Sequence, residues 1–133
     1  MTEPAITRGI HHLGLNVGRL EASADFFVRL LGWREVRRDP DHPAIFVSDG
    51  TVMLTLWGAA PDANSFDFRH NVGLHHVALA VPSRAALDAV CARIREAEGV
   101  SIEFAPEPLR GGPAMHMMCI EPSGIRIEFI WPG

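Results

Sequence analysis

Two short stretches of this chain alternate apolar and polar residues in nearly the same way. They are GIHHLGLNV at residues 9–17 and GLHHVALAV at residues 73–81. Alternation with a period of two is typical of a β-strand that buries one face. In the first copy Leu13, Leu15 and Val17 predict the buried face, which leaves His12 and Asn16 on the other face. The chain therefore repeats one strand pattern.

A helical spacing of apolar residues follows each copy of the strand. The two expected buried helix faces are Leu20, Ala24, Phe27 and Leu31 in the first half, and Leu87, Val90, Cys91 and Ile94 in the second. Ser83 is suited to cap the start of the second helix. Gly32 and Gly99 are suited to end the two helices. Each half thus continues from a strand into a helix.

Three further strands are predicted behind each helix. Their ranges are 33–38, 44–48 and 51–57 in the first half, and 101–105, 115–121 and 125–131 in the second. Turn-forming residues separate these ranges. The fold class is therefore α+β, with module 1 at about residues 8–58, a polar linker at about 59–71 and module 2 at about 72–133. Each module has one helix, so its sheet needs a partner for its second face, within one chain or between chains.

Composition restricts the classes of function. The 133 residues are 47% hydrophobic and 21% charged, a balance typical of one globular domain. A formal net charge of -4 argues against a nucleic-acid surface. The one basic cluster, Arg34, Arg37 and Arg38, is interrupted by Glu35 and predicts a solvated strand edge. The partner class that remains is a small molecule.

Cysteine usage and the N-terminus indicate a reducing, aqueous compartment. Cys91 and Cys119 lie among apolar residues and predict buried thiols. The start of the sequence lacks a signal-peptide pattern, and no apolar run approaches the roughly 18 residues of a membrane span. We expect a cytoplasmic protein that does not contact a membrane.

Three polar residues stand on the strand faces opposite the predicted core. His12 and His76 hold equivalent places in the two repeats, beside small residues. Glu128 lies on the same kind of face in the last strand, where a buried carboxylate is costly unless it is paired or binds a metal. Two imidazoles and one carboxylate form a 2-His-1-carboxylate set, which suits a divalent ion with open positions. We predict a metal site at His12, His76 and Glu128.

The remaining polar candidates are weaker. The counterpart of Glu128 in module 1 is expected at Met53 or Leu54, neither of which is a ligand for a hard ion. His11 and His75 are expected to be bystanders. His116 is a candidate catalytic base, whereas Asn16, Arg110 and Met118 are candidate substrate-binding residues. Met115 and Met117 predict core or pocket lining.

Taken together, these motifs resemble the vicinal oxygen chelate superfamily. This superfamily includes glyoxalase I, bleomycin-resistance proteins, fosfomycin-resistance thiol transferases, methylmalonyl-CoA epimerase and extradiol dioxygenases. The resemblance runs from residues 10–13 through 26–32 and 74–79 to 121–128. It implies two βαβββ modules whose mixed sheets close into a cup-shaped barrel with the helices outside. It also implies metal ligands at His12, His76 and Glu128.

The resemblance leaves several reactions open. Three ligands favour a dioxygenase that cleaves the ring of a catechol-like compound, with one divalent ion per site and Fe(II) as the favoured ion. A glyoxalase- or epimerase-like lyase or isomerase, or a thiol transferase, would use Mn, Ni, Zn or Co. A bleomycin-resistance-like binding protein is the non-catalytic alternative. In members of this size, His12 of one copy commonly completes the site of the other, so the resemblance implies a homodimer with two sites.

Overall fold

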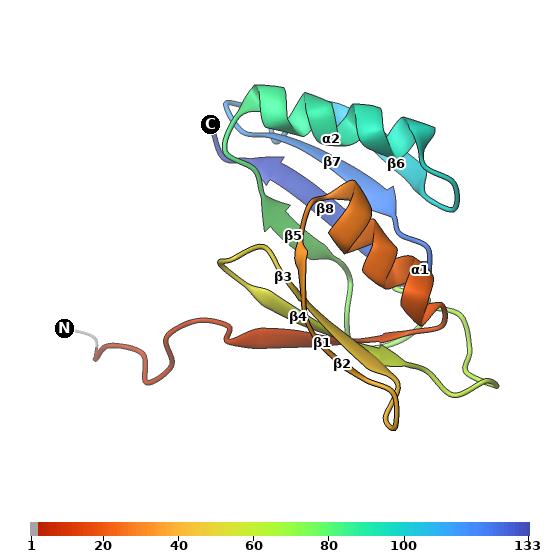
Figure 1. The fold of residues 1–133 in the computed structure, drawn as a ribbon. Helices are drawn as coiled ribbons and strands as arrows, with labels where there is room; N and C mark the ends of the chain where they lie inside the picture. The colour runs from red at the N-terminus through yellow and green to blue at the C-terminus, as the bar shows by residue number, and fades with distance from the viewer. Residues whose placement is uncertain (1–2) are drawn as a thin grey trace.

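A computed structural model describes residues 3–133 of the chain. Module 1 contains β1 (His12–Val17), α1 (Leu20–Asp25), a π-helical turn η1 (Phe26–Leu30), β2 (Arg34–Asp39), β3 (Ala44–Ser48) and β4 (Met53–Gly58). Module 2 contains β5 (Val77–Ala80), α2 (Arg84–Glu96), β6 (Ser101–Pro108), β7 (Met115–Ile120) and β8 (Arg126–Trp131). Each module therefore has the expected order βαβββ (Figure 1).

The two modules share one sheet topology. Their strand orders are β1-β4-β3-β2 and β5-β8-β7-β6, in two separate four-stranded sheets. The first strand of each module pairs in parallel with the last, and the other pairs are antiparallel. Two mixed sheets with few helices confirm the α+β class. Closure of the sheets into a cup is not part of this single-chain arrangement and remains a prediction.

The helices bury the faces that the sequence predicts. Ala24 and Phe27 are buried on α1 and η1, and Leu87, Cys91 and Ile94 are buried on α2. The hydroxyl of Ser83 accepts a hydrogen bond from the Ala86 amide, so its role as the helix cap is confirmed. One difference is that β6 runs to Pro108, three residues beyond its expected end, because its pairing with β7 resumes at Glu107 and Pro108 after a bulge.

A polar cluster joins the two modules on their helical side. Ser23 of α1 donates a hydrogen bond to Glu121, which precedes β8, at 2.6 Å. The Arg19 amide donates to the Ser123 hydroxyl at 3.0 Å, and the Arg93 guanidinium of α2 donates to the Leu30 carbonyl at 3.0 Å. Figure 1 shows α1 lying between the two sheets, where it contacts β3 and β4 of its own module. These contacts fix one module against the other through the helices.

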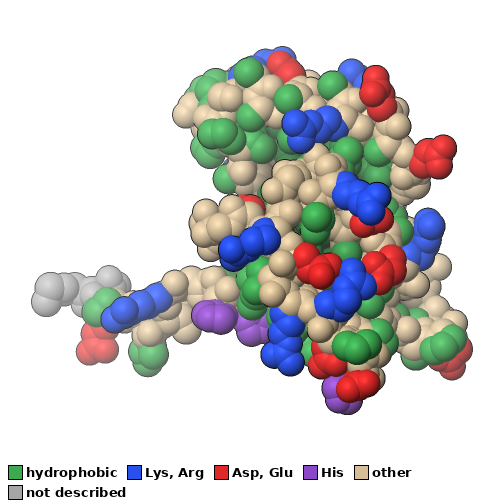
Figure 2. All heavy atoms as spheres, in the orientation of Figure 1, with side chains coloured by type: hydrophobic (Ala, Val, Ile, Leu, Met, Phe, Trp, Pro, Cys, Tyr) green, Lys and Arg blue, Asp and Glu red, His purple; other side chains and the backbone are tan. Residues whose placement is uncertain are grey.

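The surface follows the predictions from charge. Arg34, Arg37 and Arg38 are exposed on β2, an edge strand of its sheet, and Arg38 pairs with Glu21 and Glu35. Figure 2 shows basic and acidic side chains interspersed on one face of the molecule. No helix within residues 3–133 is long and apolar enough to cross a membrane. Cys91 and Cys119 are buried thiols, as expected.

Candidate metal centre

The open face of each sheet, defined as the face opposite its helix, carries the candidate side chains. On β1, His12, Gly14 and Asn16 are exposed while Leu15 and Val17 are buried. On β5, Ala78 and Ala80 are exposed between the buried Val77 and Leu79. The alternation read from the sequence is therefore correct for both repeats.

Glu128 lies at the centre of the open face of module 2 and contacts two histidines. Its Oε1 is 3.1 Å from His76 Nε2, and its Oε2 accepts a hydrogen bond from His116 Nδ1 at 2.5 Å. The Glu128 side chain is 11% exposed, so its charge is largely removed from water. The buried acid is thus paired, as its burial demands. His116 packs against Phe104, with ring centroids 4.8 Å apart.

Arg126 holds the segment that carries His76. Its guanidinium forms a two-point ion pair with Glu103, at 3.0 and 2.7 Å, and lies over the Phe68 ring at 4.1 Å from the centroid. The same guanidinium contacts the carbonyl oxygen of His75 at 3.3 Å and His75 Nδ1 at 3.2 Å. Arg126 holds the pKa of the Glu103 carboxyl below its ordinary value. His76 lies just before β5 and outside its strand pairing, so the contacts of Arg126 with the neighbouring His75 hold this segment in place.

The histidine pair 75–76 has a defined hydrogen-bond direction. A guanidinium only donates, so His75 Nδ1 accepts from Arg126. His75 Nδ1 is also 2.7 Å from His76 Nδ1, and the proton between them therefore belongs to His76. The other ring nitrogen of His76, Nε2, then faces the Glu128 carboxylate.

The open face of module 1 differs at the position equivalent to Glu128. Gly14 pairs with Thr55 as Ala78 pairs with Glu128, so the counterpart of Glu128 is Thr55. The prediction of Met53 or Leu54 is wrong, because Leu54 is buried on the core face and Met53 pairs with His12. Thr55 is followed on this face by Trp57, whose indole N–H donates to the threonine hydroxyl at 3.0 Å.

The structure brings together only part of the predicted ligand set. His76 and Glu128 adjoin each other, whereas His12 belongs to the other sheet. Within residues 3–133 of one chain, no three His, Cys, Asp or Glu side chains are placed to hold a metal ion. The three-ligand site therefore remains a prediction that requires a further contribution. His11 and His75 were expected to be bystanders, but each contacts the histidine that follows it through its Nδ1 atom, at 2.9 Å and 2.7 Å respectively.

The three candidate substrate-binding residues lie in different places. Met118 pairs directly with Glu128 across β7 and β8, on the same open face. Asn16 is exposed on β1 and borders a cavity of about 780 Å³ formed with the linker. Arg110 lies in the turn between β6 and β7, in a left-handed backbone conformation with φ of 50°. Only Met118 adjoins the Glu128 carboxylate.

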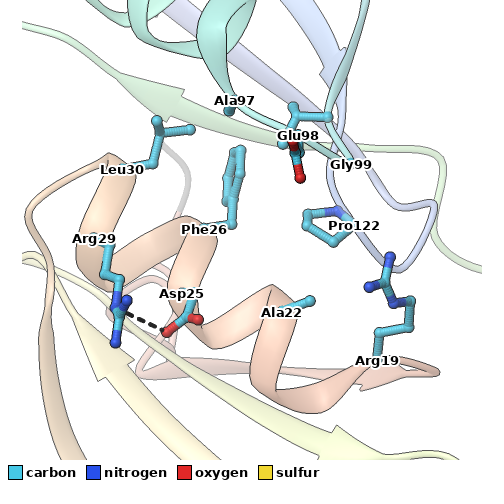
Figure 3. A pocket seen from close by; sticks show the side chains of 11 residues that line it. Arg19, Ala22, Asp25, Phe26, Arg29, Leu30, Ala97, Glu98, Gly99 and Pro122 are labelled. Carbon is cyan, nitrogen blue, oxygen red and sulfur yellow. Dashed lines mark ion pairs between the residues drawn. The ribbon is translucent and has the colours of Figure 1, made fainter.

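A second cavity, of about 630 Å³, lies between α1, η1 and the turn after α2 (Figure 3). Phe26 projects into it, and Arg29 pairs with Asp25 at its border. None of the predicted metal ligands lines either cavity. These hollows are therefore separate from the candidate centre on the open faces.

Buried Glu121 is the other unusual acid. Burial raises the pKa of its carboxyl, and hydrogen bonds from Ser23 and from the Ile125 and Ser123 amides act in the opposite direction. Burial likewise raises the pKa of the Cys119 thiol to about 12, which makes it a poor nucleophile. Both groups lie on the helical side of the sheet or at its end. Their features point to a role in folding.

These features define a class of protein, a duplicated βαβββ fold with a histidine and carboxylate centre on the open face of its sheets. Residues 9–129 match the family model described as Glyoxalase/Bleomycin resistance protein/Dioxygenase superfamily. The chain belongs to this superfamily, which includes enzymes such as lactoylglutathione lyase and whose members typically use a divalent metal.

Characterised relatives and solved structures agree with this placement. The chain is 30% identical to lactoylglutathione lyase from Salmonella typhimurium over 130 residues, covering 90% of this chain and 89% of the relative. It is 29% identical to the enzyme of that name from Neisseria meningitidis over 126 residues, covering 90% and 87%. A glyoxylase/bleomycin resistance protein/dioxygenase domain from Frankia has a TM-score of 0.81 at 22% identity, covering 96% and 99%. The structural likeness concerns the fold alone.

Proposed function

We propose that this protein is a divalent-metal-dependent enzyme that binds a small substrate through two adjacent oxygens. The observation that carries the proposal is the 3.1 Å separation of His76 Nε2 and Glu128 Oε1. Two neighbouring ligands of one ion, each bonded at about 2.0 to 2.2 Å, lie about 3 Å apart. The donor atoms are thus spaced as a pair of ligands, and the other oxygen of Glu128 is oriented by His116.

The third protein ligand is proposed to be His12 of a second copy. In one chain, contacts from α1 and α2 join the helical sides of the modules and leave the open-face residues of the edge strands β1 and β5 exposed. Placing the open face of module 1 from one copy over that of module 2 from another would close the cup. It would also bring His12 to the His76 and Glu128 pair. The protein is therefore proposed to be a homodimer with two sites.

Mixed dimers test this arrangement directly. His12→Ala and Glu128→Ala homodimers should each lack a complete site. A dimer with one chain of each kind should regain one intact site, with about one metal ion per dimer, because the intact His12 and the intact His76 and Glu128 meet across the subunits. Recovery of metal binding supports the proposal. A mixed dimer that binds no metal, or a wild-type protein that is monomeric at micromolar concentration, contradicts it.

The reaction proposed first is oxidative ring cleavage of a catechol-like compound. Two histidines and one carboxylate leave positions open beside the protein ligands, and Fe(II) held by such a set supplies oxygen activation. Thr55, at the place of Glu128 in module 1, adds no fourth anionic ligand. His116 donates Nδ1–H to Glu128, and its Nε2, which lies 4.0 Å from Glu107 Oε1, is the ring nitrogen proposed to accept a substrate proton.

A second candidate is a lyase or isomerase reaction, favoured by the relatives named lactoylglutathione lyase. Mn, Ni, Zn or Co would then stabilise negative charge on the chelated oxygens. Metal analysis of protein purified without chelator separates the two candidates. Iron, with oxygen uptake on catechols, supports ring cleavage. Formation of lactoylglutathione with one of the other ions supports the lyase, and protein free of metal and inactive in both assays excludes both.

A further inference from the structure

The open face of module 1 carries an aromatic side chain where module 2 carries its acid. Thr55 is only 3% exposed although it lies on the open face, because the indole of Trp57 bonds to its hydroxyl and shields it. Trp57 itself is 42% exposed. A side chain that could extend into solvent is thus folded back against the sheet, beside β1.

Gly14 leaves space beside the Thr55 hydroxyl to which the indole bonds. A Cβ at position 14 would lie 3.2 Å from the Thr55 hydroxyl oxygen and 3.6 Å from Trp57 Nε1, which is too close for the first of these contacts. The indole therefore lies over the backbone of β1 where that strand has no side chain. Phe46 flanks it, with ring centroids 5.8 Å apart. One side of the indole is packed against protein, and part of its surface faces outward.

The indole is also close to the predicted ligand of this sheet. Gly14 is two residues from His12 along β1, which corresponds to about 6.6 Å at the rise of a strand. A substrate that is bound beside His12 and extends along β1 toward Gly14 would reach the indole. The indole N–H of Trp57 donates a hydrogen bond to the Thr55 hydroxyl, so the ring is already oriented before a ligand binds.

We propose that Trp57, fixed by Thr55 and seated over Gly14, binds the planar ring of an aromatic substrate by stacking. The inference rests on the proposed metal-dependent function and deepens it by assigning a residue that recognises the ring of the substrate. It assigns Trp57 as a specificity-determining residue. The chelated oxygens provide affinity for any vicinal-oxygen ligand, and the indole provides preference for an aromatic one.

Two chelators that differ only by a ring test the proposal. Benzohydroxamate and acetohydroxamate present the same pair of oxygens, with a phenyl and a methyl group respectively. Calorimetric titration of the metal-loaded dimer should give at least about tenfold tighter binding of benzohydroxamate. In Trp57→Ala this preference should fall to about twofold or less, and Trp57→Phe should keep part of it. Thr55→Val, which keeps the shape but not the hydroxyl, should reduce the preference for benzohydroxamate toward the value in Trp57→Ala.

The outcomes distinguish this inference from the function on which it rests. Wild-type protein that binds no metal overturns both. Protein that binds metal and both chelators equally well overturns the inference alone. A Trp57→Ala variant that dissociates into monomers, or that weakens both chelators by the same factor, also overturns it, because the indole would then serve the contact between copies.

Discussion

Glu128 and Thr55 occupy equivalent positions in two sheets of the same topology, yet their surroundings are opposite in kind. Around Glu128 the open face of module 2 is ionic and enclosed, with His76, His116 and Arg126 in contact or nearby. Around Thr55 the open face of module 1 is aromatic and exposed. One backbone plan therefore supports an ionic half and an aromatic half, because open-face residues are not required for the core.

The largest expected effect comes from exchanging these two residues. Glu128→Thr should weaken metal binding by more than about 100-fold, since even the loss of a residue that only supports a ligand costs about 10- to 100-fold. Thr55→Glu should tighten binding, because it adds a carboxylate facing the assembled site. Equilibrium dialysis with Co²⁺ measures both. A Glu128→Thr protein that binds metal as well as the wild type would show that Glu128 is not a ligand.

The turns that precede the last strands form the next comparison. Asp49 and Glu121 each accept two backbone amides, but Asp49 is exposed and Glu121 is buried against Ser23. Glu121→Ala should lower the free energy of unfolding by about 2–4 kcal/mol, since it leaves buried donors unpaired. Asp49→Ala should lower it by about 0.5–1 kcal/mol. Urea unfolding measures both, and equal losses would contradict the role of Glu121 in joining the modules.

His116 sharpens the comparison because the ring that bonds to Thr55 in module 1 is an indole and not an imidazole. His116→Ala should weaken metal binding by about 10- to 100-fold, as expected when the hydrogen bond that orients a carboxylate ligand is removed. His116→Asn places an amide N–H near the position of Nδ1 and should restore most of this affinity while activity stays low. If the asparagine variant recovers full activity, His116 orients Glu128 but does not transfer protons.

The smallest expected effect is a pH dependence of the stability of the fold, which arises from Glu121 in module 2. The pKa of Glu121 is raised by burial above its ordinary value of 4.5. The protonated form is therefore favoured in the fold, so this stabilisation is fully present below pH 4.5 and is lost as the pH rises through the folded pKa. The free energy of unfolding of Glu121→Gln, relative to that of the wild type, should therefore increase as the pH rises through that range. Urea titrations at several pH values measure the difference, and a gain by wild type instead would contradict the sign.

Most of the fold could be predicted from the sequence. Alternation at residues 9–17 and 73–81 identified the repeated strand, and helical spacing identified the buried sides of Phe27 and Leu87. These signals are local, because one chain segment shows its own periodicity without reference to any other. The extra length of β6 was not predicted, because it depends on pairing with β7 beyond a bulge.

The candidate centre was predicted only in part. His76 and Glu128 were identified by their face and chemistry, and their contact agrees with that reasoning. Matching Gly50 to Gly124 placed Leu54 opposite Glu128, but the turn of module 1 is longer by one residue before its strand, and the true counterpart is Thr55. A shift of one residue exchanges the two faces of a strand. The sequence match therefore placed Leu54, a core residue, at the position equivalent to Glu128.

By itself the sequence determined which face of each strand is apolar and which residues can carry chemistry, because alternation and residue type are properties of a single segment. The tertiary structure decided which of those residues meet. His116 adjoins Glu128, Arg126 anchors His75, and Trp57 covers Thr55 through strand register and side-chain contact. Register is set by turn length and by hydrogen bonds between segments, so it is a property of the assembled sheet.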